Sequence, residues 1–399
     1  MKIAGIIAEY NPFHNGHAYH ICRTRKLSGC DYVVVCMAGH FTQRGEPAIL
    51  SKWDRARMAL SCGADAVFEL PALFALRPAD AFAAGGVGVL GGIGADLLSF
   101  GCEIDSAVTL TRLAELREDE PAEFSESVRR RLDSGMAHAR AWGETAGEWL
   151  GLPPDALNQP NLALAVEYLR AVRRRFPNME ALPVKRAGAG YHDRHMGEYA
   201  SASAIRSALA EGRLTEALSV IPEAARPWAV PDRLHAMDDM LLYRLRSMSI
   251  EDLNALPGMG EGLEHRLYKL CRQASGRASL LEALKCKRYT HARLSRLLLH
   301  AALGITQAEV DSIPSPPYAR LLGARSDAGP LLRELKARAS LPILSGAAAL
   351  RDDPCFDIEC RATDLWALLH DEPALRRQGR EFYERFISSI SATNRHSDN

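Results

Sequence analysis

The chain has 399 residues, enough for two or three domains of ordinary size. Hydrophobic residues make up 47% and charged residues 25%, which indicates a globular protein with a substantial core and excludes a disordered chain. Lys and Arg together number 49, as do Asp and Glu, so the formal net charge is zero. A nucleic-acid surface would therefore need a local concentration of basic residues.

Cysteine usage and hydropathy point to a cytoplasmic protein. The nine cysteines form no CxxC pair, as expected of small buried hydrophobes in a reducing cytosol. The apolar start of the chain is short and lacks a small-residue cleavage site, so it predicts a strand and not a signal peptide. No stretch approaches 18 continuous apolar residues without Gly or charge, so we expect no membrane span.

Strand-like and helix-like segments alternate over about the first 200 residues. Strands are expected at 2–10, 31–39, 64–71, 95–101 and 181–188. Helices are expected at 16–28, 51–63, 79–92, within a helical excursion over 110–150, and at 161–176. The alternation predicts a Rossmann-like, doubly wound parallel sheet, whose ligands bind beyond the carboxyl ends of the strands.

Beyond about residue 205 the pattern becomes helical, with helices expected at 203–218, 231–248 and 285–304. The Pro-rich stretch "SIPSPPY" then indicates another boundary. We therefore predict three domains. They are an α/β nucleotide-binding domain over 1–205, a mainly helical domain over 206–310, and a small C-terminal α/β or helical domain over 311–399.

The segment His14-Asn15-Gly16-His17 stands between the first predicted strand and helix. Histidines of metal sites usually come three to five apart on a helix or near Cys and carboxylates, and here the only close carboxylate is Glu9. A Gly at this junction lets backbone N–H groups face an anion, and imidazoles can donate to phosphate oxygens. The residues favour a phosphate-handling site and leave a metal site or a structural turn open.

This placement resembles the HxGH signature of the nucleotidylyltransferase superfamily. The block "GHFTQRGEPAILSKWDRARMAL" is, alone, typical of a charged surface loop and helix. With "YNPFHNGH" and "GADAVFELP" it closely resembles the tRNA(Met) cytidine acetate ligase family. Similar blocks follow in family order over nearly the whole chain: "LSFGCE", "PNLALAVEYLRA", "KRAGAGYHD", "SASAIR", "KRYTHARLSR" and "PPYARLLG".

Two positions depart from that family, which usually has Asn where this chain has His40 and Ser where it has Ala38. Both lie beside the signature and not within it. They leave open whether His40 changes loop packing, substrate contact or activity.

The resemblance implies a ligase that acts in two steps. ATP and acetate first give acetyl-adenylate and pyrophosphate. The acetyl group then passes to N4 of the wobble cytidine of elongator tRNA(Met), forming N4-acetylcytidine and releasing AMP. Mg²⁺ carried on the ATP phosphates is expected, without predicted protein ligands. Two alternatives remain: a small-molecule nucleotidylyltransferase of cofactor biosynthesis, and a non-catalytic RNA-binding protein.

Matching motif positions implies an ATP site at the end of the first strand, the histidine turn and four later positions. These residues are Ile7, Glu9, Tyr10, Asn11, Pro12, Phe13, His14, Asn15, Gly16, His17, His20, Gly101, Asn161, Arg186 and Ser203. Asn161 also suits a helix cap, Arg186 a salt bridge, and Ser201 or Ser203 an N-cap.

The same comparison suggests which residues act on the phosphates. His14 and His17 are predicted to stabilise phosphate charge, with Lys52, Arg186 and Arg206 as helpers. In the superfamily, a Ser/Thr-rich helix start followed by Arg holds the β- and γ-phosphates, a role that would fall here to Ser203 and Arg206.

Residues 285–300 contain seven basic or histidine side chains and no acidic residue. Such a helix face is often merely solvated, but Lys and Arg beside a tyrosine also suit an RNA backbone and its bases. The predicted tRNA contacts are Lys285, Lys287, Arg288, Tyr289, Arg293 and Arg296.

Overall fold

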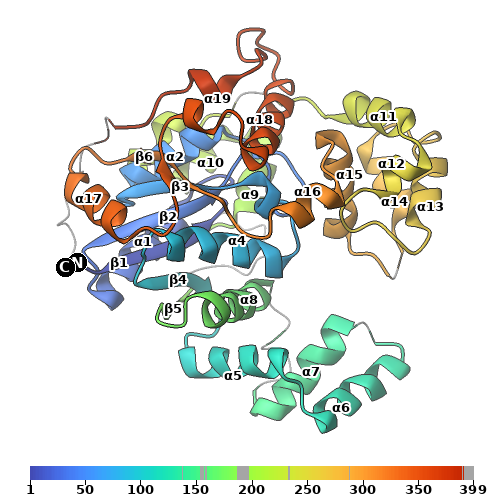
Figure 1. Cartoon of the computed structure of the whole chain (residues 1–399), viewed down its shortest axis with the longest axis horizontal. Coiled ribbons are helices and arrows are strands. Elements are labelled where there is room, and N and C mark those ends of the chain that lie inside the picture. Colours follow the sequence, from blue (N-terminus) through green and yellow to red (C-terminus); the bar gives the residue numbers. More distant parts are fainter. Residues whose placement is uncertain are drawn as a thin grey trace.

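The computed structural model describes residues 1–136, 138–152, 157, 160–186, 197–231, 234–286, 288–388 and 390. Within these residues, seven strands form one sheet in the order β5-β4-β1-β2-β3-β6-β7 (Figure 1). The five predicted strands are confirmed as β1 (Ile3–Ala8), β2 (Tyr32–Ala38), β3 (Ala66–Leu70), β4 (Leu97–Cys102) and β5 (Glu180–Lys185). They are mutually parallel, as the alternation predicted.

Alternate residues of the central strands enter two different cores. Val33 and Val35 of β2 belong to one hydrophobic cluster, and Val34 and Cys36 to the other. This is the consequence of the two-residue period of a strand that is covered on both faces. The covering helices include α1 (Asn15–Ser28), α2 (Lys52–Ser61), α3 (Ala72–Ala75), α4 (Ala79–Gly92) and α8 (Pro160–Arg175).

The glycine-rich segment near residue 85 forms the buried helix that the sequence predicted. Gly86 of α4 faces β1, where a Cβ atom would lie 2.6 Å from Cδ1 of Ile7. The helix therefore packs closer to the sheet than any side chain would allow. The predicted excursion after β4 becomes three helices at the lower edge of Figure 1: α5 (Ala107–Glu118), α6 (Ala122–Asp133) and α7 (His138–Leu150).

The chain becomes helical after β5, as the pattern beyond about residue 205 predicted. Two short helices, α9 (Ala202–Ala210) and α10 (Leu214–Ser219), precede the 3-10 turn η1 (Glu223–Trp228), which packs on α2. Residues of α9 and α10 share a small hydrophobic cluster of their own, and a larger core forms beyond residue 237, in what we call the helical unit, residues 238–303 (Figure 1, right). Its helices are α11 (Asp238–Ser247), α12 (Ile250–Asn254), α13 (Leu263–Leu270), α14 (Arg277–Leu284) and α15 (His291–Leu303).

The prediction of a separate C-terminal domain over 311–399 differs from the structure. After α16 (Gln307–Ser312), strand β6 (Ala319–Ala324) pairs antiparallel with β3, and β7 (Ile343–Leu344) extends the same sheet. The Pro-rich stretch is thus a connection back to the first domain. The remaining elements are α17 (Gly329–Arg338), the turn η2 (Ala347–Leu350), α18 (Pro354–Ala367) and α19 (Arg380–Tyr383).

A buried ion cluster joins this C-terminal segment to the sheet. Lys52 of α2 donates to Glu69 of β3, to Glu359 of α18 at 3.1 Å and to Glu381 of α19 at 2.6 Å. Arg320 of β6 donates to Glu69 at 2.9 Å and also to Glu381. At most 4% of any of these five side chains is exposed, so each charge depends on its partners.

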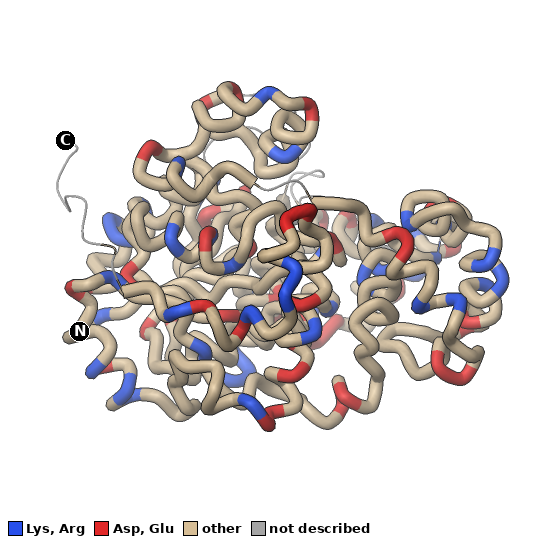
Figure 2. The backbone as a smooth tube through the Cα atoms, turned by 90° about the horizontal axis from the view of Figure 1, so that it is seen from above, with Lys and Arg blue, Asp and Glu red and all other residues tan. Residues whose placement is uncertain are grey.

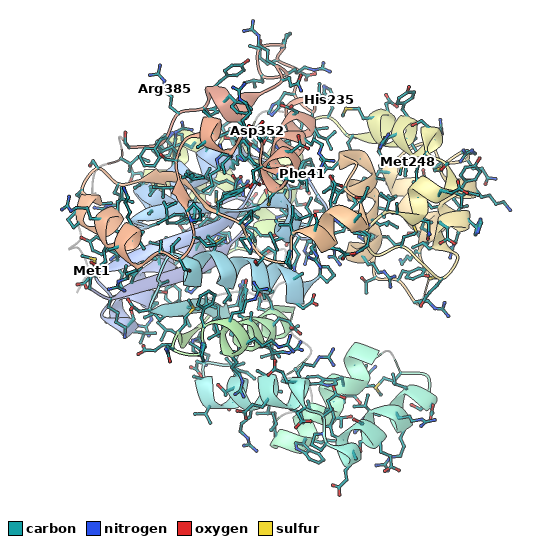
Figure 3. The ribbon with its side chains drawn as sticks, viewed as in Figure 1. Met1, Phe41, His235, Met248, Asp352 and Arg385 are labelled. Atoms are coloured by element: carbon teal, nitrogen blue, oxygen red, sulfur yellow. The ribbon has the colours of Figure 1, made fainter. Side chains whose placement is uncertain are left out.

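The structure therefore corrects the assignment of Lys52 as a phosphate-stabilising helper. Its ammonium group is fully buried among three carboxylates and does not line the cavity described below. Nearby His40 is also buried, with its ring 4.4 Å from that of Trp366 and its Nδ1 3.0 Å from Oγ1 of Thr363. His40 thus fits a core position, and Figure 3 labels Phe41, the next residue in the sequence.

One group of candidate metal ligands occurs among the described residues, and it coincides with this cluster. Ligand atoms of His40, Glu359 and Glu381 lie within 4.8 Å of one another. Lys52 already donates to both carboxylates, so an ammonium group supplies the positive charge there. None of the helices in the described ranges combines the length and apolar character needed to span a bilayer.

Replacing Lys52 with Met should lower the free energy of unfolding by about 3–5 kcal/mol, because it leaves buried carboxylates without a partner. Urea denaturation followed by circular dichroism measures this. Arg57→Met is the matched control, since Arg57 on the same helix forms a partly exposed pair with Asp54 and should cost less than about 1 kcal/mol. A stable K52M variant that lost activity would restore Lys52 to the catalytic site.

The ion cluster should also make stability depend on pH. Burial and the neighbouring Glu69 carboxylate raise the pKa of Glu359 from its ordinary 4.5 to about 8. Between these values the folded chain holds a proton that the unfolded chain releases, so the free energy of unfolding falls as pH rises from 4.5 to 8. Glu359→Gln removes this contribution. Denaturation of both proteins at pH 5, 7 and 9 should show wild type losing stability relative to E359Q; parallel profiles would contradict the assignment.

Candidate functional site

A cavity of about 340 Å³ lies at the carboxyl ends of β1, β4 and β5, where α1 and α9 begin. This is the edge of a doubly wound sheet at which ligands are expected. Most of the predicted nucleotide residues line it, together with Arg206: Ile7, Glu9, Tyr10, Asn11, His14, Gly16, His17, His20, Gly101, Asn161, Arg186 and Ser203.

Among the described residues, three that were predicted to bind the nucleotide do not line the cavity: Pro12, Phe13 and Asn15. Phe13 is fully buried, with its ring 4.8 Å from that of Tyr10. The Asn15 side chain donates to the carbonyl of Glu198 at 3.0 Å. These residues belong to the turn but do not face the cavity. A motif match does not distinguish such a structural role from contact with the ligand.

The two signature histidines cap α1 reciprocally. Nδ1 of His14 accepts the N–H of Gly16 at 3.1 Å, and Nδ1 of His17 accepts the N–H of His14 at 3.2 Å. These contacts satisfy N–H groups that have no partner inside the helix. The two rings stack with their centroids 3.7 Å apart, so the turn and the imidazoles form one unit.

The capping contacts determine which imidazole nitrogen carries the proton. Because each Nδ1 accepts a hydrogen bond, the neutral ring must carry its proton on Nε2. Burial, with the cations Arg186 and Arg206, lowers the pKa of His14 to about 3. Burial and the neighbouring His14 place the pKa of His17 well below its ordinary range. Both rings are therefore neutral Nε2–H donors at physiological pH.

His20 lies one turn further along α1 and also borders the cavity. Its Nε2 contacts Oγ of Ser99 in β4 at 3.0 Å, and that hydroxyl contacts Thr24 at 2.7 Å. Burial and Arg186 lower its pKa to about 4. A hydrogen bond to the sheet thus fixes His20, which makes it a support of the cavity floor.

Cationic side chains approach the cavity from two later elements. Arg206 of α9 donates to the carbonyl of Asn11 at 2.7 Å, so it links the helix to the histidine turn. Arg186 follows β5 and packs beside Gly101, where a Cβ atom would lie at an ordinary contact distance of 3.4 Å from Cγ of Arg186. Asn161 lies within α8 and not before it, and its amide donates to Glu103 at 2.6 Å.

The start of α9 combines a cap with the cavity wall. Oγ of Ser201 accepts the N–H of Ala204 at 3.1 Å, which confirms a serine N-cap. The hydroxyls of Ser201 and Ser203 are 3.0 Å apart, and both residues line the cavity. The amino end of this nine-residue helix therefore faces the cavity with two hydroxyls.

The loop of residues 42–46 supplies cavity residues that the site prediction left out. Thr42, Gln43, Arg44 and Glu46 all line the cavity. The N–H of Gln43 donates to the carboxylate of Glu9 at 2.6 Å, and burial raises the pKa of that carboxyl. The "TQRGEP" block was the available signal, but alone it also fits a surface loop.

The predicted basic face over 285–300 divides into exposed and engaged side chains. Arg288 is exposed and pairs with Glu261 at 3.1 Å, and the Tyr289 hydroxyl donates to the same carboxylate. The Arg293 guanidinium lies 4.7 Å from the centroid of the mostly buried Tyr289 ring. Lys285 is exposed near Glu282, and Lys287 lies outside the described residues.

Arg296 differs from its predicted place on an RNA-facing surface. It is half-buried and donates to the carbonyl of Gln43 at 3.0 Å. His300 is buried, and its Nε2 contacts the carbonyl of Leu76 at 2.9 Å. These residues lie on the side of α15 that faces the α/β body.

Comparison with known proteins agrees with this geometry. A sequence model of the family described as HIGH Nucleotidyl Transferase matches residues 1–381. A tRNA(Met) cytidine acetate ligase of Acetivibrio thermocellus is 33% identical over 97% of this chain and 100% of its own length. A protein of the same description from Latilactobacillus sakei is 38% identical over 88% of this chain and 89% of its own. The chain belongs to the tRNA(Met) cytidine acetate ligase family.

Solved structures show that the likeness to this family extends to the fold. Thermotoga maritima TmcAL in its apo form matches with a TM-score of 0.89 at 30% identity, covering 98% of this chain and 100% of that one. The same protein bound with alpha-thio ATP matches with a TM-score of 0.87. The resemblance read from the sequence and the α/β fold class are both confirmed.

Substitutions at His14 should separate its capping role from its role as a donor. His14→Ala removes the acceptor for the Gly16 N–H and should cost about 1 kcal/mol in the free energy of unfolding. His14→Asn keeps an N-cap acceptor and should stay within a few tenths of a kcal/mol of wild type. Urea denaturation tests both. Equal destabilisation by the two substitutions would show that the imidazole ring, and not the cap, stabilises the turn.

Proposed function

We propose that this chain is an ATP-dependent ligase that activates acetate as acetyl-adenylate and transfers the acetyl group to N4 of the wobble cytidine of elongator tRNA(Met). The observation that carries the proposal is the pair of neutral, reciprocally capped histidines at a nucleotide-sized cavity, in a chain of this family. The product would be N4-acetylcytidine, with AMP and pyrophosphate released. Such a reaction on tRNA belongs in the cytoplasm.

In the first step an acetate oxygen attacks the α-phosphate and the bond to pyrophosphate breaks. Negative charge builds on the phosphate oxygens, so fixed donors lower the barrier without a general base. We assign this role to His14 and His17, whose Nε2–H groups are held in place by the cap. Arg186 and Arg206 add positive charge in the same lining.

The amino end of α9 suits the β- and γ-phosphates. Its amino end and the Ser203 hydroxyl face the cavity, and Arg206 follows one turn later. Mg²⁺ is held mainly by phosphates, water and one or two carboxylates, and the Glu9 and Glu46 carboxyls in the lining fit that requirement. When bound, the ion would neutralise phosphate charge.

The remaining residues of the lining would bind the rest of the nucleotide. Ile7, Tyr10, Asn11 and Gly16 belong to the strand end and the turn, while Gly101 and Asn161 approach from β4 and α8. Close backbone at Gly101 suits the adenine or ribose. His20 would support this group through Ser99.

In the second step the N4 amine of the cytidine attacks the acetyl carbonyl, the bond to AMP breaks, and the amine loses a proton. The anticodon loop supplies an unstacked base for this attack. We propose that the helical unit holds the tRNA backbone through Lys285, Lys287, Arg288 and Arg293. Tyr289 would contribute by supporting Arg293 instead of stacking on a base.

Acetate-dependent exchange of labelled pyrophosphate into ATP tests the first step without tRNA. We expect exchange with acetate, and loss of about 10²–10³-fold in rate for His17→Asn, the effect of removing one fixed donor to a transition-state oxyanion. Mass spectrometry of digested tRNA should then show N4-acetylcytidine. Exchange that required a phosphorylated cofactor precursor would favour the small-molecule nucleotidylyltransferase, and RNA binding without exchange would favour a non-catalytic protein.

A further inference from the structure

The loop of residues 42–46 connects the cavity to the helical unit, although neither the fold nor the predicted site requires such a connection. The loop is closed by backbone hydrogen bonds from Thr42 to Glu46 and from Gly45 to Thr42, both 2.9 Å. It carries Gln43, Arg44 and Glu46 into the cavity lining. These two internal hydrogen bonds set the shape of the loop, but they do not set its position relative to the cavity.

On the cavity side, the loop is attached to the end of β1. The N–H of Gln43 donates to Oε1 of Glu9 at 2.6 Å, and Glu9 itself lines the cavity. This contact couples the loop position to the strand that leads into the histidine turn.

On the opposite side, α14 and α15 of the helical unit bind the outward-facing carbonyls of the loop. Arg296 donates to the carbonyl of Gln43 at 3.0 Å. The carbonyl of Gly45 accepts from Arg277 at 2.9 Å and from the hydroxyl of Ser295 at 3.1 Å. Two outward carbonyls of the loop are thus bound by three side chains that lie more than 230 residues away in sequence.

Backbone packing at Gly45 makes this contact close as well as polar. Gly45 has φ of +71°, and a Cβ atom there would lie 2.6 Å from the backbone nitrogen of Arg296. Only glycine permits the loop to rest directly on α15 in this conformation. A larger residue would have to move the loop off the helix.

We propose that Arg277, Ser295 and Arg296 are positioning residues for the adenylate-forming step, because they hold the 42–46 loop against the nucleotide cavity. The inference rests on the proposed function for the identity of the nucleotide. Arg296 then acts on ATP through the loop and not on the tRNA backbone. The guanidinium groups of Arg277 and Arg296 are half-buried, and carbonyl oxygens already accept from them.

Arg296→Gln tests this role through two equilibrium constants. We expect the dissociation constant for ATP, from equilibrium dialysis, to rise about tenfold, because a charge-assisted hydrogen bond to the loop is lost. The dissociation constant for tRNA, from filter binding, should stay within about twofold. Arg296→Lys should recover part of the ATP affinity because it keeps a charged donor. A tRNA affinity that fell while ATP affinity held would overturn the proposal.

Arg246→Gln is the matched control. Arg246 is also an arginine of the helical unit that donates to backbone carbonyls, those of Cys271 and Ala274, but it does not contact the loop. It should leave ATP binding unchanged while reporting any general loss of stability, measured as the thermal midpoint. Unchanged ATP affinity in R296Q, or an equal loss in R246Q, would contradict a specific positioning role.

Gly45→Ala supplies a second test that changes no charge. It should weaken ATP binding in the same direction as R296Q and leave tRNA binding intact, because the loop is displaced while the exposed basic residues remain. The ATP measurement does not need acetate. If ATP affinity falls as expected but wild type shows no acetate-dependent exchange, the proposed function fails and the positioning role stands.

Discussion

The site depends on one pair of hydrogen bonds, those that His14 and His17 exchange with the backbone at the start of α1. A helix start needs acceptors for its first N–H groups, and here imidazole nitrogens provide them. The same bonds place the remaining ring proton on Nε2 and stack the rings against each other. Capping therefore fixes the orientation and the tautomer of both rings, and burial keeps both rings neutral.

Arg55 holds this turn in relation to the neighbouring strand. Its fully buried guanidinium donates to the carbonyl of Glu9 at 2.6 Å, to those of Ala38 at 3.0 Å and Gly39, and to Leu50 at 3.2 Å through Nε. Five fixed donors suit a point where strand ends leave carbonyls without sheet partners. The ends of β1 and β2 are thus joined beneath the cavity, and the 42–46 loop emerges from that junction.

Much of the fold followed from local patterns in the sequence. The Val-rich run at β2 and the glycine-rich helix α4 were predictable because parallel strands and close-packed helices leave local signatures. Strand β6 was not predictable in this way. It is short and pairs with β3 across some 250 residues, so its strand conformation depends on the edge of the sheet and not on a local pattern. The buried position of Lys52 could not be predicted for the same reason, because its partners Glu359 and Glu381 are more than 300 residues away in the sequence.

The basic segment at α15 shows what a charge pattern in a sequence cannot predict. Seven basic or histidine side chains without an acid suggested one RNA-binding face, yet Glu261 supplies the acid from another loop and Arg296 turns toward backbone carbonyls. Figure 2 shows Lys and Arg interspersed with Asp and Glu along the chain. A sequence shows how many cations a helix carries, but burial and neighbouring acceptors decide which of them can meet a phosphate. Here Arg296 is bound to the carbonyl of Gln43, whereas Arg288, which precedes α15, stays exposed beside Glu261.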